Sequence, residues 1–269
     1  MPDEVSASLK GKYALITGAS RGIGAAIALQ LAKKGIDGIA ITYLGSESRA
    51  KSICSDIAKY GTKAVAIQAD ILSCTFGEDV VQSALQKLET SHLDIIVNNA
   101  ALADLKGQQN FTETTLDGFQ LMLQGNTFAP ISLIRAALPH LPAYGGRVIN
   151  ISSISSREPN PDPIMTYGAS KAALDSYTRS LATKYAAEKH ATFNSVSTGP
   201  TTTEGMNAIM DTLPAAAIER FKSKQTAEHR FGTPEDVAFV VGFLASEESR
   251  WINGASIPAN GGGVIVLHG

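Results

Sequence analysis

The sequence predicts a single α/β domain in which helices cover both faces of a doubly wound parallel sheet of about seven strands. Three observations support this fold class. Short apolar runs alternate with longer stretches of helical periodicity along the 269 residues. Runs such as residues 93–97 are apolar over almost their whole length, which is typical of strands buried on both faces. No internal repeat, low-complexity segment or long linker divides residues 1–269 into further domains.

The first half of the chain begins with a flexible polar tail, residues 1–8, and then alternates strands with helices. Residues 13–17 form an apolar run and are expected as the first strand, followed by a glycine-rich turn and a helix to residue 34. Gly35 and Gly61 suit the left-handed position just past a helix end. The further elements are strand 38–43, helix 47–60, strand 63–69, helix 77–90 and strand 93–98.

The second half continues the alternation with longer helices. Apolar runs predict strands at 147–152, 192–197 and 255–259, and longer periodic stretches predict helices at 112–138 and 167–189. A last helix starts at Pro234, a residue favoured at the first helical position. Residues 204–230 form a variable helical stretch before it.

The composition excludes several classes of function. The net charge of −2 offers no basic surface for nucleic acid. No apolar run reaches the length of a membrane-spanning helix, and the first residues do not begin a signal peptide. Cys54 and Cys74 lack the spacing of metal or redox sites and are expected as reduced thiols. We therefore expect a cytoplasmic protein with no metal and no membrane or nucleic-acid partner.

A glycine loop spans residues 17–24, between the first strand and the first helix. Gly18 can adopt backbone angles that are costly for other residues, and Gly22 and Gly24 permit close approach and tight helix packing. The start of a helix offers unpaired N–H donors to a pyrophosphate. The loop predicts a dinucleotide site, and a purely structural glycine turn is the alternative.

The second strand indicates which dinucleotide binds. An acidic residue at the end of this strand would hold the ribose hydroxyls of NAD. Residues 42–46 contain no acidic residue, and the first one that follows is Glu47. Arg21 lies in the glycine loop, where its guanidinium could bind a 2′-phosphate. These residues favour NADP(H). The alternatives are that Arg21 is simply solvated and that Glu47 reaches the ribose.

A tyrosine and a lysine, Tyr167 and Lys171, follow the serine-rich strand end 150–153 at a short interval. Four residues apart, they share one helix face. A nearby ammonium favours tyrosinate, so the pKa of Tyr167 is expected below its usual value near 10, as suits a proton donor to a developing alkoxide. Tyr185 and Lys189 have the same spacing without a serine-rich strand end, and we interpret them as a solvated surface pair.

With these motifs in this order, the chain resembles the short-chain dehydrogenase/reductase family over nearly its full length. The resemblance also rests on the strand-end sequence Asn98-Asn99-Ala100. It implies a single Rossmann-type domain with the activity of an NADP(H)-dependent ketoreductase. The catalytic residues that it implies are Asn126, Ser153, Tyr167 and Lys171.

The resemblance also implies the cofactor contacts. Asp70 corresponds to a residue that contacts adenine, and residues 199–203 to the segment that holds the nicotinamide carboxamide. The full set that it implies is Gly18, Ser20, Arg21, Gly22, Ile23, Gly24, Tyr43, Ser46, Asp70, Ile71, Asn98, Ala100, Tyr167, Lys171, Pro200, Thr201 and Thr203.

The implied mechanism gives each catalytic residue a role. Ser153 would hold the substrate carbonyl, with Ser152 as the alternative, while Tyr167 donates a proton and hydride arrives from the nicotinamide. Lys171 would bind the nicotinamide ribose and keep the tyrosine acidic. Asn126 would hold a water that reconnects Lys171 to solvent, unless it is a surface amide of its helix.

Three features depart from the family pattern or extend it. Thr198 replaces a proline and could reshape the wall of the nicotinamide site. Asn260 replaces an acid and is expected to affect packing more than chemistry. Residues 157–163 contain three prolines and are expected to border the substrate entrance.

The substrate and the assembly are predicted in outline. Residues 204–230 are expected to cover a small apolar ketone, such as a polyketide-like or other secondary metabolite, although ordinary packing explains their apolar side equally well. That side comprises Met206, Ile209, Met210, Leu213 and Phe221. The alternative function, kept open by Thr198, is non-redox catalysis such as a cyclisation, or sensing.

The resemblance further implies a homo-oligomer, a dimer or tetramer, paired through the helices at 112–138 and 167–189. Leu174, Tyr177 and Leu181 are candidates for this seam, and the protein's own core would explain them equally well.

Overall fold

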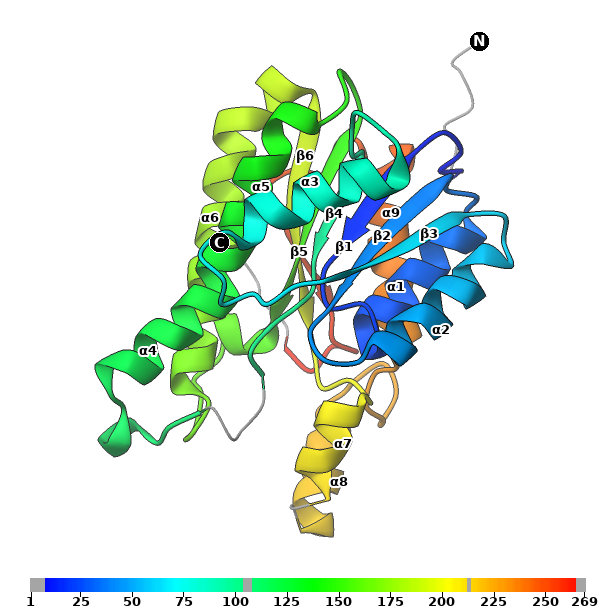
Figure 1. Cartoon of the computed structure of the whole chain (residues 1–269). Helices are drawn as coiled ribbons and strands as arrows, with labels where there is room; N and C mark the ends of the chain where they lie inside the picture. Colours follow the sequence, from blue (N-terminus) through cyan, green and yellow to red (C-terminus); the bar gives the residue numbers. More distant parts are fainter. Residues whose placement is uncertain (1–7, 104–107, 212–213, 265–269) are drawn as a thin grey trace.

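The apolar runs of the sequence form one parallel sheet in the computed structural model, which describes residues 8–103, 108–211 and 214–264. The strand order is β3-β2-β1-β4-β5-β6-β7, with helices on both faces (Figure 1). This confirms the predicted fold class. The strands are β1 (Tyr13–Ile16), β2 (Gly38–Tyr43), β3 (Lys63–Gln68), β4 (Ile95–Asn98), β5 (Gly146–Ser153), β6 (Ala191–Thr198) and β7 (Ser256–Ala259).

Two layers of helices bury the two faces of the sheet in separate apolar clusters. One layer comprises α1 (Gly22–Lys33), α2 (Glu47–Ala58) and α9 (Pro234–Leu244). The other comprises α3 (Phe76–Leu88), α5 (Ala129–Ala137) and α6 (Met165–Lys189), as Figure 1 shows. The predicted bounds of α1, α2, α3 and α6 and the predicted start of α9 hold to within a few residues.

The long helix expected at 112–138 is divided into several parts. A 3₁₀ turn, Phe111–Glu113, precedes α4 (Leu116–Leu123), because the Thr115 hydroxyl accepts the Gly118 N–H at 3.1 Å and starts the helix there. A π-helical turn, Gln124–Phe128, then joins α4 to α5. Such turns occur frequently at functional sites, and this one contains Asn126.

The strand order reverses between β1 and β4, and crevices for ligands form at such points outside the carboxyl ends of the strands. The glycine loop, Asn98 and Ser153 all lie at these ends. The short helices α7 (Glu204–Met210) and α8 (Ala215–Ser223) project from the same end of the sheet (Figure 1).

Most of the predicted tail, residues 1–7, lies outside the described residues. Among the residues that are described, no helix combines the length and the apolar character needed to cross a membrane.

Candidate active site

Tyr167 lies in the first turn of α6, facing the end of β5. The Ser153 side chain lies close enough to the phenol to act on its pKa, and the Ser153 hydroxyl accepts the N–H of Ser155 at 3.1 Å. Ser152 is buried, and its hydroxyl has no hydrogen-bond partner among the described residues. Of the two candidate serines, it is therefore Ser153 that contacts the tyrosine.

Lys171 follows one helical turn later, and its side chain is only 3% exposed. Its Nζ donates to the carbonyl of Ile151 at 2.9 Å and lies 5.9 Å from the centroid of the Tyr167 ring. Burial lowers the pKa of Lys171 from 10.5 to about 8, although the carboxylate of Asp175 opposes this shift. The ammonium is thus held beneath the tyrosine by the end of β5.

The expectation that Lys171 lowers the pKa of Tyr167 is wrong in this structure. Burial raises the pKa of Tyr167 because it disfavours the phenolate, and the hydrogen bond from Ser153 offsets only part of this shift. The Lys171 ammonium is engaged by the Ile151 carbonyl instead. The phenol is therefore neutral at neutral pH, which is the state of a proton donor.

Asn126 lies inside the protein, so its interpretation as a surface amide is wrong. Its side chain is fully buried in the π-helical turn. Its Oδ1 accepts the N–H of Leu102 at 2.7 Å, and its Nδ2 lies near the Leu102 carbonyl, the Met122 sulfur and the Ser170 hydroxyl. The amide joins the segment after β4 to α6, which carries Tyr167.

The glycine loop is packed too tightly for side chains. A Cβ on Gly18, where φ is +63°, would lie 2.9 Å from the Cα of Ala100, and one on Gly24 would lie 2.6 Å from the Nδ2 of Asn99. Asn99 fixes the loop, because its Nδ2 donates to the carbonyls of Thr17 and Gly18 at 2.9 and 3.0 Å. The sequence motif contained Asn99, but only the structure gives it this role.

The side chain of Asn98, a predicted cofactor residue, is directed into the sheet towards β5. It is buried, and its Nδ2 donates to the Oδ1 of Asn150 on β5 at 2.8 Å. Asn150 in turn donates to the hydroxyl of Thr178 on α6. Only the backbone of Asn98 would thus be available to a cofactor.

The start of α1 presents a site suited to a pyrophosphate. Its first turn, which includes Ile23, contains no acidic residue, and the side chain of Arg21 at the N-cap makes no capping hydrogen bond. Ser20 is half-buried beside it. Thr203 closes the other side, since a Cβ on Gly22 would lie 3.3 Å from its methyl group.

Two arginines gather at the end of β2. Arg21 and Arg49 both bind the Oε2 of Glu204, at 3.1 and 2.6 Å. Glu47, the residue that could have reached a ribose, instead pairs with Lys51 at 2.7 Å. The sequence indicated Arg21 only, because Arg49 lies on the following helix and its approach depends on the tertiary fold.

The predicted adenine-side residues lie at the ends of β2 and β3. Tyr43 is half-buried at the end of β2, and Ser46 is the N-cap residue of α2. Asp70 is exposed just past β3, where its Oδ1 accepts the N–H of Leu72 at 2.9 Å. Ile71 lies against the π-helical turn, 3.3 Å from where a Cβ on Gly125 would be.

The segment after β6 is held firmly despite its threonine. The Thr198 hydroxyl donates to the carbonyl of Ser152 at 2.9 Å, so it links the ends of β6 and β5. The N–H of Gly232 donates to the carbonyl of Pro200, and Thr201 forms a parallel bridge with Gly232. Thr198 thus supports the wall of the site through its hydroxyl where proline would do so through its ring.

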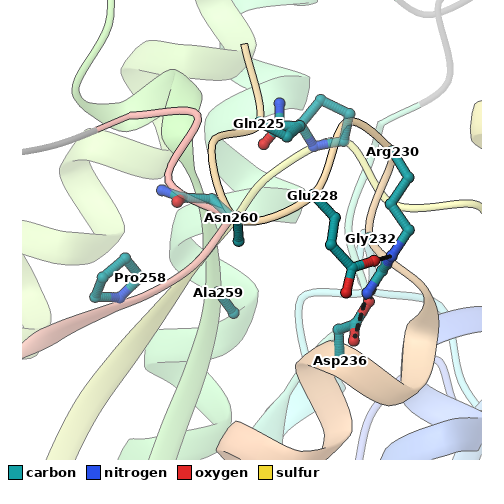
Figure 2. Close-up of a pocket in the computed structure, with 11 residues that line it drawn as sticks. Gln225, Glu228, Arg230, Gly232, Asp236, Pro258, Ala259 and Asn260 are labelled. Carbon is teal, nitrogen blue, oxygen red and sulfur yellow. Dashed lines mark hydrogen bonds and ion pairs between the residues drawn. The ribbon is translucent and has the colours of Figure 1, made fainter. Parts of the chain in front are cut away.

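Asn260 packs as predicted. Its backbone would lie 3.0 Å from a Cβ on Gly199, and its Oδ1 accepts the N–H of Gly262. It also lines a cavity of about 220 Å³ between the segment after β6, the start of α9 and β7 (Figure 2). Arg230 in this cavity is bound by Glu228 and Asp236, and none of the residues predicted to be catalytic lines it.

The proline loop at 157–163 lies across the start of α6. Asn160 donates to the carbonyl of Ser155, and a Cβ on Gly168 would lie 2.1 Å from its Nδ2. Asp162 accepts the N–H of Phe111 at 2.9 Å. The loop therefore connects α6, the helix that carries Tyr167, to the turn that precedes α4.

The second tyrosine–lysine pair differs from the first. Tyr185 is half-buried and packs against the apolar cluster on the α3 side of the sheet, so the prediction of a solvated surface pair holds only in part for it. Lys189 pairs with Glu188 at 3.3 Å. The structure brings no strand-end serine to Tyr185 among the contacts described for it.

Comparisons with known proteins agree with this arrangement. A family model described as Enoyl-(Acyl carrier protein) reductase matches residues 18–263. Short chain dehydrogenase penD of Penicillium thymicola is 54% identical over 256 residues, which cover 95% of this chain and 92% of that protein. Short chain dehydrogenase asqE of Emericella nidulans is 51% identical over 256 residues, with 95% and 94% covered.

Solved structures share the fold over nearly the whole chain. A short chain dehydrogenase from Burkholderia cenocepacia, in complex with NADP, matches with a TM-score of 0.84 and 37% identity, covering 95% of this chain and 98% of its own. LugOII, described as a promiscuous reductase that catalyses keto-reduction at C1 during lugdunomycin biosynthesis, matches with a TM-score of 0.85 and 34% identity, covering 96% and 99%. With Ser153, Tyr167 and Lys171 grouped at the glycine-loop end of the sheet, these matches show that the chain belongs to the short-chain dehydrogenase/reductase family of oxidoreductases.

Proposed function

We propose that the protein is an NADPH-dependent reductase of a ketone on an apolar small molecule, or oxidises the corresponding secondary alcohol. The observation that carries the proposal is the placement of the Ser153 hydroxyl beside the half-buried, neutral phenol of Tyr167, with Lys171 one turn away. Reduction of a ketone needs a proton donor at the carbonyl oxygen, and a phenol with a raised pKa keeps its proton until that charge develops.

The residues present fit a phosphorylated dinucleotide. The loop around Gly18 and Gly24 has no space for side chains, and the start of α1 offers its N–H groups without a competing acid. Arg21 and Arg49 supply positive charge beside the end of β2, where a 2′-phosphate would need it. Bound NADPH supplies the hydride for the reaction, and solved relatives in complex with NADP or NADPH support this cofactor.

The chain's own residues handle the proton. The Ser153 hydroxyl orients the carbonyl oxygen, and Tyr167 gives that oxygen its proton. Lys171 has a pKa of about 8, so it can both hold and release a proton near neutral pH. It can therefore help to return a proton to Tyr167 after the phenol has given its own to the substrate. We assign Asn126 a positioning role, since its amide is engaged by Leu102 and Ser170.

The substrate class follows from the segment at 204–230. Met206 and Met210 are half-buried on α7, and Phe221 is 44% exposed on α8. These flexible and aromatic side chains suit an apolar ligand of irregular shape. Leu213 and the side chain of Ile209 lie outside the described residues. The similarity to LugOII, a reductase of lugdunomycin biosynthesis, supports a secondary metabolite as substrate.

The assembly and the location are proposed on separate grounds. Tyr177 on α6 is 49% exposed and Phe128 before α5 is 47% exposed, so both are available to a homo-oligomer, a dimer or tetramer. Leu174 is buried and belongs to the protein's own interior, so it is removed from the predicted seam. Sedimentation velocity tests the assembly. Cell fractionation tests the cytoplasmic location predicted from the sequence.

A panel of apolar ketones assayed by NADPH oxidation tests the proposed activity. We expect turnover with the wild type and a loss of about 100-fold or more in Tyr167→Phe, which keeps the ring but removes the proton. Tyr185→Phe is the matched control and should retain wild-type activity. Product formed without NADPH oxidation would instead support non-redox catalysis. Since the Thr198 hydroxyl is accounted for by its bond to Ser152, no observation favours that function as a second candidate.

A further inference from the structure

Glu204 connects the adenosine end of the cofactor site to the segment expected to cover the substrate. It is the first residue of α7, directly after Thr203, which packs beside Gly22 of the glycine loop. Its Oε2 accepts from Arg21 at 3.1 Å and from Arg49 at 2.6 Å. Three segments far apart in sequence therefore meet at a single carboxylate oxygen.

The two guanidiniums are accessible to another anion. The side chains of Arg21, Arg49 and Glu204 are 61%, 49% and 56% exposed, so a ligand could reach all three. A carboxylate and a phosphate monoester bind guanidinium groups with the same geometry, and the phosphate carries more charge and more acceptor oxygens. Glu204 neutralises only one of the two positive charges.

This inference rests on the proposed use of NADP(H). We propose that Glu204 is a specificity-determining residue that competes with the 2′-phosphate of the cofactor for Arg21 and Arg49. A cofactor with the 2′-phosphate displaces Glu204 from the guanidiniums, and a cofactor without it leaves the pair intact. Because Glu204 begins α7, the displacement releases the start of the substrate-covering segment, so that the phosphate couples cofactor identity to the mobility of α7.

Binding measurements on Glu204→Gln test the competition. The substitution keeps the size of the side chain and removes its charge. We expect NADPH and adenosine 2′,5′-bisphosphate to bind about 1.5-fold to fivefold more tightly to the variant, the range typical of exposed ion pairs. NADH and AMP should bind unchanged. Glu219→Gln is the matched control, since Glu219 pairs with Lys222 on α8 and should alter none of these affinities.

A change in the NADPH affinity in the opposite direction overturns the proposal. If Glu204 orients the guanidiniums for the phosphate instead of competing with it, the Glu204→Gln variant binds NADPH more weakly. Unchanged NADPH affinity overturns it equally. If the wild type itself binds NADPH no more tightly than NADH, the proposed cofactor is wrong; a wild-type preference without an effect of Glu204→Gln contradicts this inference alone.

Limited proteolysis gives a readout that does not depend on affinity. Trypsin can cleave after Arg220, Lys222 and Lys224 in the covering segment. Adenosine 2′,5′-bisphosphate should bring the cleavage rate of the wild type towards that of Glu204→Gln, whereas AMP should not. The bisphosphate should leave the rate in the variant unchanged. A wild-type rate that is insensitive to the bisphosphate would show that α7 is not released.

Discussion

Replacing Lys171 by methionine removes a buried ammonium from α6 while keeping a side chain of similar length. In the folded protein the pKa of Lys171 falls from 10.5 to about 8, because burial disfavours the charged form. The unfolded chain keeps the ordinary pKa. At pH 7 folding therefore carries the charge into the interior at a cost of about 3 kcal/mol.

Lys171→Met avoids this cost of burying a charge, and most of the gain in stability remains after one loss is subtracted. The carbonyl of Ile151 loses the donor that binds it at 2.9 Å, which offsets about 1 kcal/mol of the gain. We therefore expect Lys171→Met to raise the free energy of unfolding at pH 7 by about 2 kcal/mol. The same variant should lose the reductase activity.

The pH dependence gives the sign of the effect. Between pH 8 and 10.5 the unfolded chain binds a proton that folded Lys171 has released, so the stability of the wild type rises with pH in this window. Below it the cost is present in full. The methionine variant lacks this rise, so its advantage should disappear at high pH.

Urea-induced unfolding followed by circular dichroism, without cofactor at pH 7 and pH 10, measures both quantities. Lys189→Met is the matched control, because Lys189 lies on the same helix and pairs with Glu188 at the surface. Its effect should stay within about 0.5 kcal/mol. The reasoning is refuted if Lys171→Met is less stable than the wild type at pH 7, or if its gain is the same at both pH values.

Three further substitutions have expected outcomes. Ser153→Ala removes the bond that lowers the pKa of Tyr167, so the rate of alcohol oxidation should reach half its maximum at a higher pH, with turnover reduced about 100-fold. Asp175→Asn removes the carboxylate that raises the pKa of Lys171, so the corresponding limb of the pH–rate profile should move below about 8. Gly24→Ala should destabilise the protein by about 1–3 kcal/mol in urea unfolding and weaken NADPH binding, because a Cβ would overlap the glycine loop.

Each of these has a control in the chain. Ser152→Ala should leave the pH profile in place, since the Ser152 hydroxyl has no partner among the described residues, and an equal shift in both serine variants would contradict the role of Ser153. Asp175→Glu keeps the negative charge, so its pH–rate profile should lie close to that of the wild type. Gly45→Ala meets nothing within 4 Å and should be neutral; similar losses at Gly45 and Gly24 would remove the packing explanation.

Local patterns were sufficient for the order of the elements and for the glycine loop. Residues close together along the chain determine both the strands buried on two faces and the glycine-rich strand-to-helix turn. The sequence therefore predicted the positions of these elements to within a few residues. The long helix was less well predicted, because the hydroxyl of Thr115 starts it late and the π-helical turn around Asn126 interrupts it. That turn bonds to Leu102, which the helical pattern does not include.

The sequence by itself determined the parallel sheet, the position of the glycine loop and the shared helix face of Tyr167 and Lys171, because short-range periodicity and spacing fix these. Only the tertiary structure decided the protonation of Tyr167 and the meeting of Arg49 with Glu204. Burial and the pairing of exposed charges depend on segments that are distant along the chain. The pKa of Tyr167 is therefore set by its packed surroundings and not by its spacing from Lys171 along the helix.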